Sequence, residues 1–191
     1  MNQSANSSVG NRAVDNSSVD NSPAVNSSVS DDPLVDDYLS SEPETVKSAS
    51  AKDLRLGAMN ILARREHSRK EVRDKLLRKF DPAVELLDAV LDQLVADDLL
   101  SDQRFSEAFV RWRVGKGQGP VKIRMALRER GVDGDAALSE CDVDWFALAV
   151  EVAHKRFGAR PASDPKQRAK RMRFLQYRGF SGEQIRAALN D

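Results

Sequence analysis

The 191-residue sequence has one cysteine, two histidines and no run of about 18 consecutive apolar residues. Its single thiol, Cys141, excludes an internal disulfide framework. The missing apolar run argues against a membrane-spanning helix, and no basic start followed by an apolar stretch marks a secretory signal. We therefore predict a cytoplasmic protein without a membrane partner.

Residues that commonly carry out catalysis or bind metals are equally scarce. Cys141, His67 and His154 lie far apart in the sequence, so they have neither metal-ligand spacing nor the arrangement of a nucleophile with its base. The glycine-rich stretch 115–119 follows no predicted strand and precedes no Gly-Lys-Ser/Thr, so it is not a phosphate loop. We predict that the protein is not an enzyme and that it uses no cofactor and no metal.

Large apolar side chains are nearly absent from residues 1–50, where NSSV recurs at Asn6, Asn16 and Asn26. Such a segment cannot bury enough surface to offset the entropy lost on ordering. It carries eight acidic and two basic side chains, whereas the rest of the chain carries 22 and 28, so a basic region follows an acidic one. We predict a disordered Asn/Ser/Asp-rich tail over residues 1–50 and a folded region over residues 51–191.

From Leu54 onward, apolar residues recur at helical spacing, and capping residues divide the pattern into nine predicted helices. In the helix expected over residues 54–66, Leu56, Met59, Leu62 and Ala63 are predicted to lie on the apolar side. Two capping boxes are expected, one at Ser68 and one at Ser181. The other predicted N-terminal caps are Asp81, Asp102, Asp142 and Asp164.

The nine predicted helices group into three similar units. A weak repeat aligns Val72, Ile123 and Arg171, and places Gly131 and Gly179 as left-handed C-caps of the second and third middle helices. The repeat units cover about residues 54–98, 99–141 and 142–191. We therefore expect an all-α fold of three tandem three-helix repeats that form an elongated, curved array.

The middle helix of each unit is predicted to be basic. Residues 68–80 carry six basic and two acidic side chains, residues 120–131 four and one, and residues 166–178 six and none. These cations are either ordinary solvated faces or a binding surface for phosphates or an acidic protein; their recurrence, and the five acidic and no basic residues between Pro82 and Asp98, favour a binding surface. The candidate contacts are Arg69, Lys70, Arg73, Lys116, Lys122, Arg124, Arg128, Lys170, Arg171 and Arg173.

Aromatic residues lie among these cations. Trp112 falls on the apolar stripe of its helix and is predicted to be a core residue, while surface ion pairs are the alternative to a contact role for its neighbours Arg111 and Arg113. Phe174 and Tyr177 lie off the apolar line of the last basic helix, so base stacking and packing remain open for both. Arg111, Arg113 and Tyr177 complete the set of candidate contact residues.

Four ordered stretches resemble the RecX family, which modulates the recombinase RecA. They read ILARREHSRKEVRDKLL, SDQRFSEAFVRWRV, GQGPVKIRMALRERGV and RFLQYRGFSGEQIRAAL, and the resemblance covers about residues 56–191. The glycine usual before Phe80 is missing, and the Asn/Ser tail has no recognisable counterpart in the family. The family fold of three tandem three-helix repeats agrees with the repeat found above.

The resemblance implies a regulator that lodges in the groove of the RecA–DNA filament and inhibits ATP hydrolysis, filament extension and strand exchange. It implies a role in recombination, DNA repair and the SOS response, and we expect a monomer that contacts DNA directly or through the filament. Two alternatives stay open: a sequence-nonspecific nucleic-acid-binding module and a helical scaffold for an acidic protein. Salt dependence separates them in part, because phosphate-dominated binding weakens steeply with ionic strength.

Overall fold

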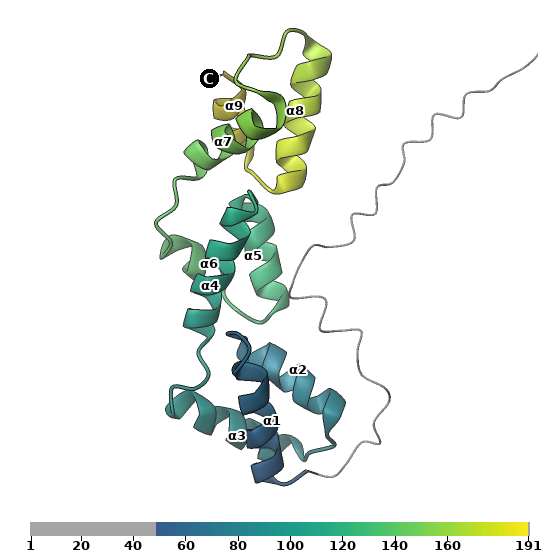
Figure 1. Cartoon of the computed structure of the whole chain (residues 1–191), viewed down its shortest axis with the longest axis vertical. Helices are drawn as coiled ribbons and strands as arrows, with labels where there is room; N and C mark the ends of the chain where they lie inside the picture. The colour runs from purple at the N-terminus through teal and green to yellow at the C-terminus, as the bar shows by residue number, and fades with distance from the viewer. Residues whose placement is uncertain (1–48, 191) are drawn as a thin grey trace, which may run out of the picture. The chain divides into compact units, whose positions relative to one another are not determined.

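The computed structural model describes residues 49–190, and within that range it consists of helices joined by turns (Figure 1). The helices are α1 (Ala51–Leu62), α2 (Arg69–Lys79), α3 (Val84–Ala96), α4 (Asp102–Gly115), α5 (Pro120–Glu129), α6 (Gly134–Ser139), α7 (Trp145–Phe157), α8 (Pro165–Arg178) and α9 (Gly182–Asn190). None of them is long and apolar enough to cross a membrane. The tail predicted over residues 1–50 lies outside the described residues except for Ala49 and Ser50.

The helices form three consecutive three-helix domains, as expected from the repeat (Figure 1). In domain 1 (α1–α3) a buried cluster includes Leu54, Leu76 and Leu91, and Leu100 of the following linker completes it. In domain 3 (α7–α9) a second cluster is built around Leu175 and Ile185. The buried residues of domain 2 (α4–α6) are Phe105, Phe109, Val110, Ile123, Leu127 and Leu138. Each domain therefore buries its own apolar side chains.

Several helix boundaries follow the predicted caps. The Asp164 side chain accepts a hydrogen bond from the Gln167 N–H at 2.8 Å, and Pro165 occupies the first helical position of α8. At the start of α9, Ser181 and Gln184 exchange the two hydrogen bonds of a capping box. Ser68 caps α2 as predicted, by accepting from the Glu71 N–H at 3.1 Å.

Three predicted caps are wrong. Helix α4 is capped by Ser101, which has an extended backbone and whose side-chain oxygen accepts a hydrogen bond from the Arg104 N–H, so Asp102 lies one residue inside the helix. Helix α7 is capped by Asp144 instead of Asp142. Helix α3 begins after Ala83 without a side-chain cap, so Asp81 does not fulfil its predicted role.

The predicted apolar side of the first helix is wrong for three of its four residues: Leu62 packs against the core of domain 1, but Ala63, Leu56 and Met59 are exposed. Leu56 and Met59 are 59% and 44% exposed, while Leu54 and Ala58 are fully buried. The helix begins at Ala51, three residues earlier than expected, and it carries two apolar stripes at helical spacing. Packing against α2 and α3 selects the stripe that contains Leu54, a choice that local periodicity does not determine.

The two predicted C-cap glycines are confirmed. Gly131 and Gly179 have φ angles of +77° and +89°. The Phe180 N–H donates to the Leu175 carbonyl at 3.1 Å, and the equivalent bond joins Val132 to Leu127 at 3.0 Å. The chain therefore reverses in the same way after α5 and after α8.

We predict that Gly179→Ala destabilises the protein by more than about 1 kcal/mol in free energy of unfolding, whereas Gly115→Ala does not. An alanine at position 179 would have to adopt a left-handed backbone conformation, and its Cβ would lie 2.4 Å from the Cβ of Lys122. A Cβ at Gly115, the last residue of α4, meets nothing within 4 Å. Urea unfolding followed by circular dichroism measures both variants, and equal stability would contradict the close packing at Gly179.

Candidate functional site

The middle helices of domains 2 and 3 meet end to end. The backbone N–H groups of Gly119 and Val121, at the start of α5, donate to the carbonyls of Arg178 and Gly179, at the end of α8, at 2.8 and 3.0 Å. A Cβ at Gly119 would lie 2.4 Å from the Gly179 oxygen, so only glycine permits this approach. The contact pairs N–H groups and carbonyls that have no partner within their own helices. We call it joint 2–3.

A corresponding contact, joint 1–2, connects the end of α5 with the start of α2. The Ser68 hydroxyl donates to the Arg130 carbonyl at 2.7 Å, and the Lys70 ammonium donates to the Glu129 carbonyl at 2.8 Å. In the repeat alignment Ser68 corresponds to Gly119 and Arg130 to Arg178. The same positions therefore meet in both joints, through backbone donors in one and side-chain donors in the other.

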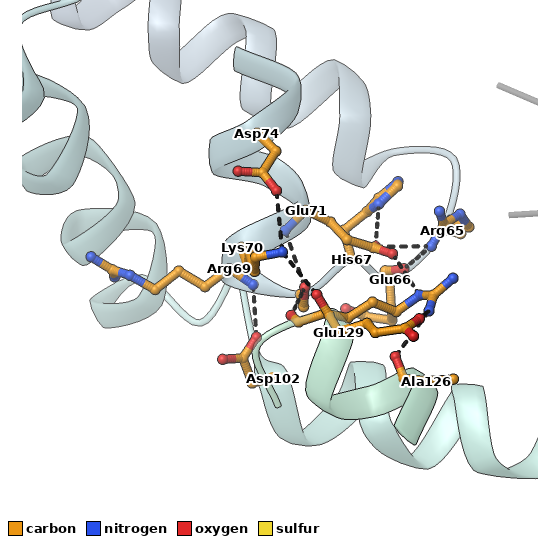
Figure 2. Close-up of polar contacts among 12 residues, drawn as sticks. Arg65, Glu66, His67, Arg69, Lys70, Glu71, Asp74, Asp102, Ala126 and Glu129 are labelled. Carbon is orange, nitrogen blue, oxygen red and sulfur yellow. Dashed lines mark hydrogen bonds and ion pairs between the residues drawn. The ribbon is translucent and has the colours of Figure 1, made fainter. Parts of the chain in front are cut away.

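Asp102 does not cap α4 because its side chain takes part in joint 1–2 (Figure 2). Its carboxylate accepts a hydrogen bond from the Arg69 N–H, at the first position of α2, at 2.7 Å. This bond satisfies an N–H with no intrahelical partner and places a negative charge at the positive end of the α2 dipole. A residue of domain 2 thus caps a helix of domain 1.

A partly buried charge cluster lies beside joint 1–2 (Figure 2). The Glu71 carboxylate oxygens lie 2.9 Å from His67 Nδ1, 3.3 Å from Arg65 Nη1 and 3.2 Å from Arg130 Nε. Burial opposes ionisation of Glu71, but the hydrogen bond from His67 and the nearby cations outweigh it and hold the Glu71 pKa below its ordinary value. His67 is only 2% exposed, and burial lowers its pKa. The cluster links the two domains through a carboxylate that stays ionised.

Sequence reasoning missed this cluster. Glu71 was assigned to a capping box, yet its side chain points to His67 instead of the Ser68 backbone. The available signal was weak: Arg130 directly precedes a predicted C-cap glycine, and His67 directly precedes a predicted N-cap. His67 and Arg130 come together only because the end of α5 packs against the start of α2 in the folded protein.

Most candidate cations of α2 and α5 are paired with acidic side chains of their own domains. In domain 1, Arg69 and Arg73 lie 2.8 and 3.5 Å from Asp92 and Asp88 of α3. In domain 2, Asp135 of α6 forms ion pairs with both Arg124 and Arg128. The acidic residues of α3 and α6 therefore reduce the net positive charge of the helices beside them.

Helix α8 differs, because within residues 49–190 none of its six basic side chains forms an ion pair. Arg168 donates to the Asn190 side chain at 2.8 Å, and Arg171 stacks over the Phe157 ring at 5.4 Å. The exposed residues Lys166, Lys170, Arg173 and Tyr177 recur at i, i+4, i+7 and i+11, which places them on one side of the helix.

The Lys122 ammonium of α5 joins this side of α8, 4.6 Å from the centre of the Tyr177 ring. We call the set Lys122, Lys166, Lys170, Arg173 and Tyr177 the α8 face. The α8 face therefore gathers five side chains from domains 2 and 3, and its cations form no ion pair among residues 49–190.

The remaining candidates take different positions. Arg113 is only 8% exposed; its guanidinium lies 4.8 Å from the ring centres of Phe109 and Trp112 and donates to Gln118 at 3.2 Å. Arg111 and Lys116 are exposed, and the Lys116 carbonyl accepts a hydrogen bond from Arg178. Trp112 is half-buried. Among the described residues, no group of three or more His, Cys, Asp or Glu side chains is arranged to hold a metal ion.

Three separately packed three-helix domains, joined through their basic middle helices, define a helical-repeat protein. Family models described as the first, second and third three-helix domains of RecX match residues 57–94, 101–137 and 142–189. The chain belongs to the RecX family of regulatory proteins.

Curated relatives and solved structures agree with this assignment. The chain is 45% identical over 144 residues to a protein of Halorhodospira halophila named "Regulatory protein RecX", which covers 73% of this chain and 88% of the relative. A protein of the same name from Pseudomonas entomophila is 44% identical over 135 residues, with 69% and 86% covered. The crystal structure of RecX from Lactobacillus salivarius matches with a TM-score of 0.63 and 26% identity, over 73% of this chain and 94% of that one.

We predict that Ser68→Ala lowers the free energy of unfolding by about 1 kcal/mol more than Ser101→Ala does. Both serines cap a helix, but only Ser68 also donates to a carbonyl of the neighbouring domain. Urea unfolding of the two variants isolates the contribution of joint 1–2. Equal losses would show that the Ser68 hydrogen bond to Arg130 does not stabilise the joint.

We also predict that acid weakens the protein through His67. Because its folded pKa lies below the ordinary 6.5, the unfolded chain takes up this proton first, and stability falls as the pH drops below 6.5. His67→Asn removes the titration and keeps a side chain that can hydrogen-bond to Glu71. Urea midpoints should therefore decline less steeply for this variant between pH 6.5 and about pH 5; an unchanged slope would exclude His67 as a source.

Proposed function

We propose that this protein binds the filament that a RecA recombinase forms on DNA, lies in its groove, and lowers ATP hydrolysis, filament extension and strand exchange. The curated relatives are named as regulatory proteins, and they match more than two thirds of this chain. A protein of three helical domains without a metal cluster among its described residues suits a role in binding.

The observation that carries the proposal is the contrast between α8 and the other middle helices. Acidic residues of α3 and α6 pair with arginines of α2 and α5, while the basic side chains of α8 are free of ion pairs among the described residues. Unpaired exposed cations attract polyanions such as a nucleoprotein filament, because phosphate contacts with Lys and Arg release condensed counterions.

The remaining predicted contacts form a weaker second set. Arg69, Arg73, Arg124 and Arg128 would have to exchange an ion pair within their own domain for one with the partner, so each adds less to affinity. Lys70, which lies 3.7 Å from Asp74, belongs to this set as well. Arg111, Lys116 and Arg171 form no ion pair among the described residues and stay candidate contacts beside the α8 face. Arg113 is left out because its guanidinium is packed between aromatic rings.

The three-domain arrangement supports binding to several subunits together. A repeat of weak contacts along a polymer gains affinity through effective concentration, since each contact holds the next domain near its own site. We therefore propose that the domains about 54–98, 99–141 and 142–191 act as one unit on the filament, with domain 3 supplying the largest electrostatic contribution.

The test is ATP hydrolysis by RecA on single-stranded DNA, with the full chain added below one copy per recombinase. We predict that the wild-type protein suppresses hydrolysis and that the variant Lys166→Glu, Lys170→Glu, Arg173→Glu requires at least about ten-fold more protein for the same effect. These side chains are exposed and make no ion pair among the described residues, so the variant should keep its helix content.

A matched control carries the same change of charge in the same domain. Lys155→Glu, Arg156→Glu, Arg160→Glu alters exposed cations outside the predicted contact set and should inhibit like the wild type. If both variants lose inhibition equally, net charge alone is responsible and the α8 face is not the site. Inhibition that requires enough protein to coat the DNA would favour a nucleic-acid-binding module that acts without contacting the recombinase.

A further inference from the structure

Tyr177 is the most exposed aromatic side chain among the large hydrophobic residues that the structure describes as exposed, with 69% of its surface accessible. It lies near the end of α8, between the exposed cations of that helix and joint 2–3. The ring is therefore not committed to the core of domain 3 and is accessible to an external partner.

One face of the Tyr177 ring is occupied by a cation from the neighbouring domain. The Lys122 ammonium lies 4.6 Å from the ring centre. The stem of Lys122 lies directly against Gly179, where a Cβ would come within 2.4 Å of the Lys122 Cβ. Joint 2–3 therefore fixes the Lys122 side chain over one face of the ring, and the high exposure of Tyr177 leaves the other face open to solvent.

The remaining residues of the α8 face extend this site along the helix. Lys166, Lys170 and Arg173 precede Tyr177 on the same side of α8, over about 16 Å of helix axis. They form no ion pairs among residues 49–190, so they are available to an external anion without first losing an acidic partner. A flat aromatic surface thus lies at one end of a row of cations.

We propose that the α8 face binds single-stranded nucleic acid directly, with one unpaired base stacked on the open face of Tyr177 and its backbone phosphates on Lys170 and Arg173. A single strand combines the two features that the site matches: flat π surfaces and regularly spaced phosphates. In a duplex the base faces are stacked on one another and cannot reach Tyr177, and an acidic peptide would contact the cations without stacking on the Tyr177 ring. This proposal rests on the proposed function and adds to it the residues of the filament-binding surface that contact nucleic acid, with Tyr177 as the stacking residue.

The test uses the full chain without recombinase, and it measures fluorescence anisotropy of labelled oligonucleotides. The probes are a thymine oligomer and an abasic backbone of the same length and charge. The wild-type protein should bind the thymine oligomer about five-fold or more tightly than the abasic one, since a stacked base contributes to affinity independently of the phosphates. Equal binding of the two probes would overturn the proposal.

Two variants of the ring separate stacking from structure. Tyr177→Phe keeps an aromatic face and should retain the preference for bases, whereas Tyr177→Ala should lose it. A purely structural role at joint 2–3 would lower the thermal midpoint of Tyr177→Ala and leave the base preference unchanged, and this result would also overturn the proposal.

A third variant tests the phosphate contacts. Lys170→Gln with Arg173→Gln should weaken both probes alike and reduce the slope of log affinity against log salt by about 1.4, because each single-strand phosphate contact contributes about 0.7. The preference for the thymine oligomer should persist in this variant. An unchanged salt slope would contradict the assigned phosphate contacts.

The outcome does not depend on RecA. If the wild-type protein inhibits RecA but binds both probes equally, the direct nucleic-acid contact is wrong and the proposed function stands. If it binds the thymine oligomer preferentially without inhibiting RecA, the proposed function is wrong and the site at Tyr177 stands.

Discussion

The joints between domains depend on the unsatisfied ends of α-helices. Every helix ends with carbonyls and begins with N–H groups that have no partner inside the helix. Here carbonyls at the end of one middle helix accept hydrogen bonds from the start of another. The Arg178 carbonyl accepts from the Gly119 N–H, and the Arg130 carbonyl accepts from the Ser68 hydroxyl. Because each domain packs its own apolar residues, these polar contacts and the short linkers carry much of the connection between domains.

The two joints use different chemistry at equivalent positions. Joint 2–3 relies mainly on backbone groups and on the close approach of two glycines, and Arg178 adds one side-chain hydrogen bond, to the Lys116 carbonyl. Joint 1–2 relies on the hydroxyl of Ser68, the ammonium of Lys70 and the carboxylates of Asp102 and Glu71, so its strength depends on salt, and the lowered pKa values of His67 and Glu71 add a dependence on pH. Domains 2 and 3 are therefore linked by the contact that is less responsive to solution conditions.

The acidic neighbours of each middle helix determine which cations are free to contact a partner. The sequence repeats a basic helix in each domain, but α3 and α6 place aspartates beside the first two of these helices. In domain 3 no acidic side chain pairs with α8 among the described residues, and joint 2–3 adds Lys122 of α5 to the same side. Of the three similar middle helices, α8 is thus the one without ion pairs among the described residues.

Sequence alone predicted the class of fold, because capping signals such as Asp164-Pro165 and the C-cap glycines act locally. It failed where the partner is distant. Asp102 caps α2 of the preceding domain, and the core of domain 1 selects Leu54 over Leu56, although both lie on apolar stripes of the same helix.

The candidate site was predictable only in part, for the same reason. Composition identified the basic helices, but the pairing of Arg124 with Asp135 and the burial of Arg113 depend on how the helices pack. The position of Lys122 over Tyr177 requires two domains in contact, which no local pattern encodes.

The most direct test of the account is amide hydrogen exchange of the full chain, alone and with a RecA filament on single-stranded DNA. Binding through the α8 face should slow exchange in α8 and in the first turn of α5, and leave the outer surface of α3 unchanged. Protection confined to domain 1, with exchange in α8 unaltered, would show that the cations of the α8 face do not form the contact surface.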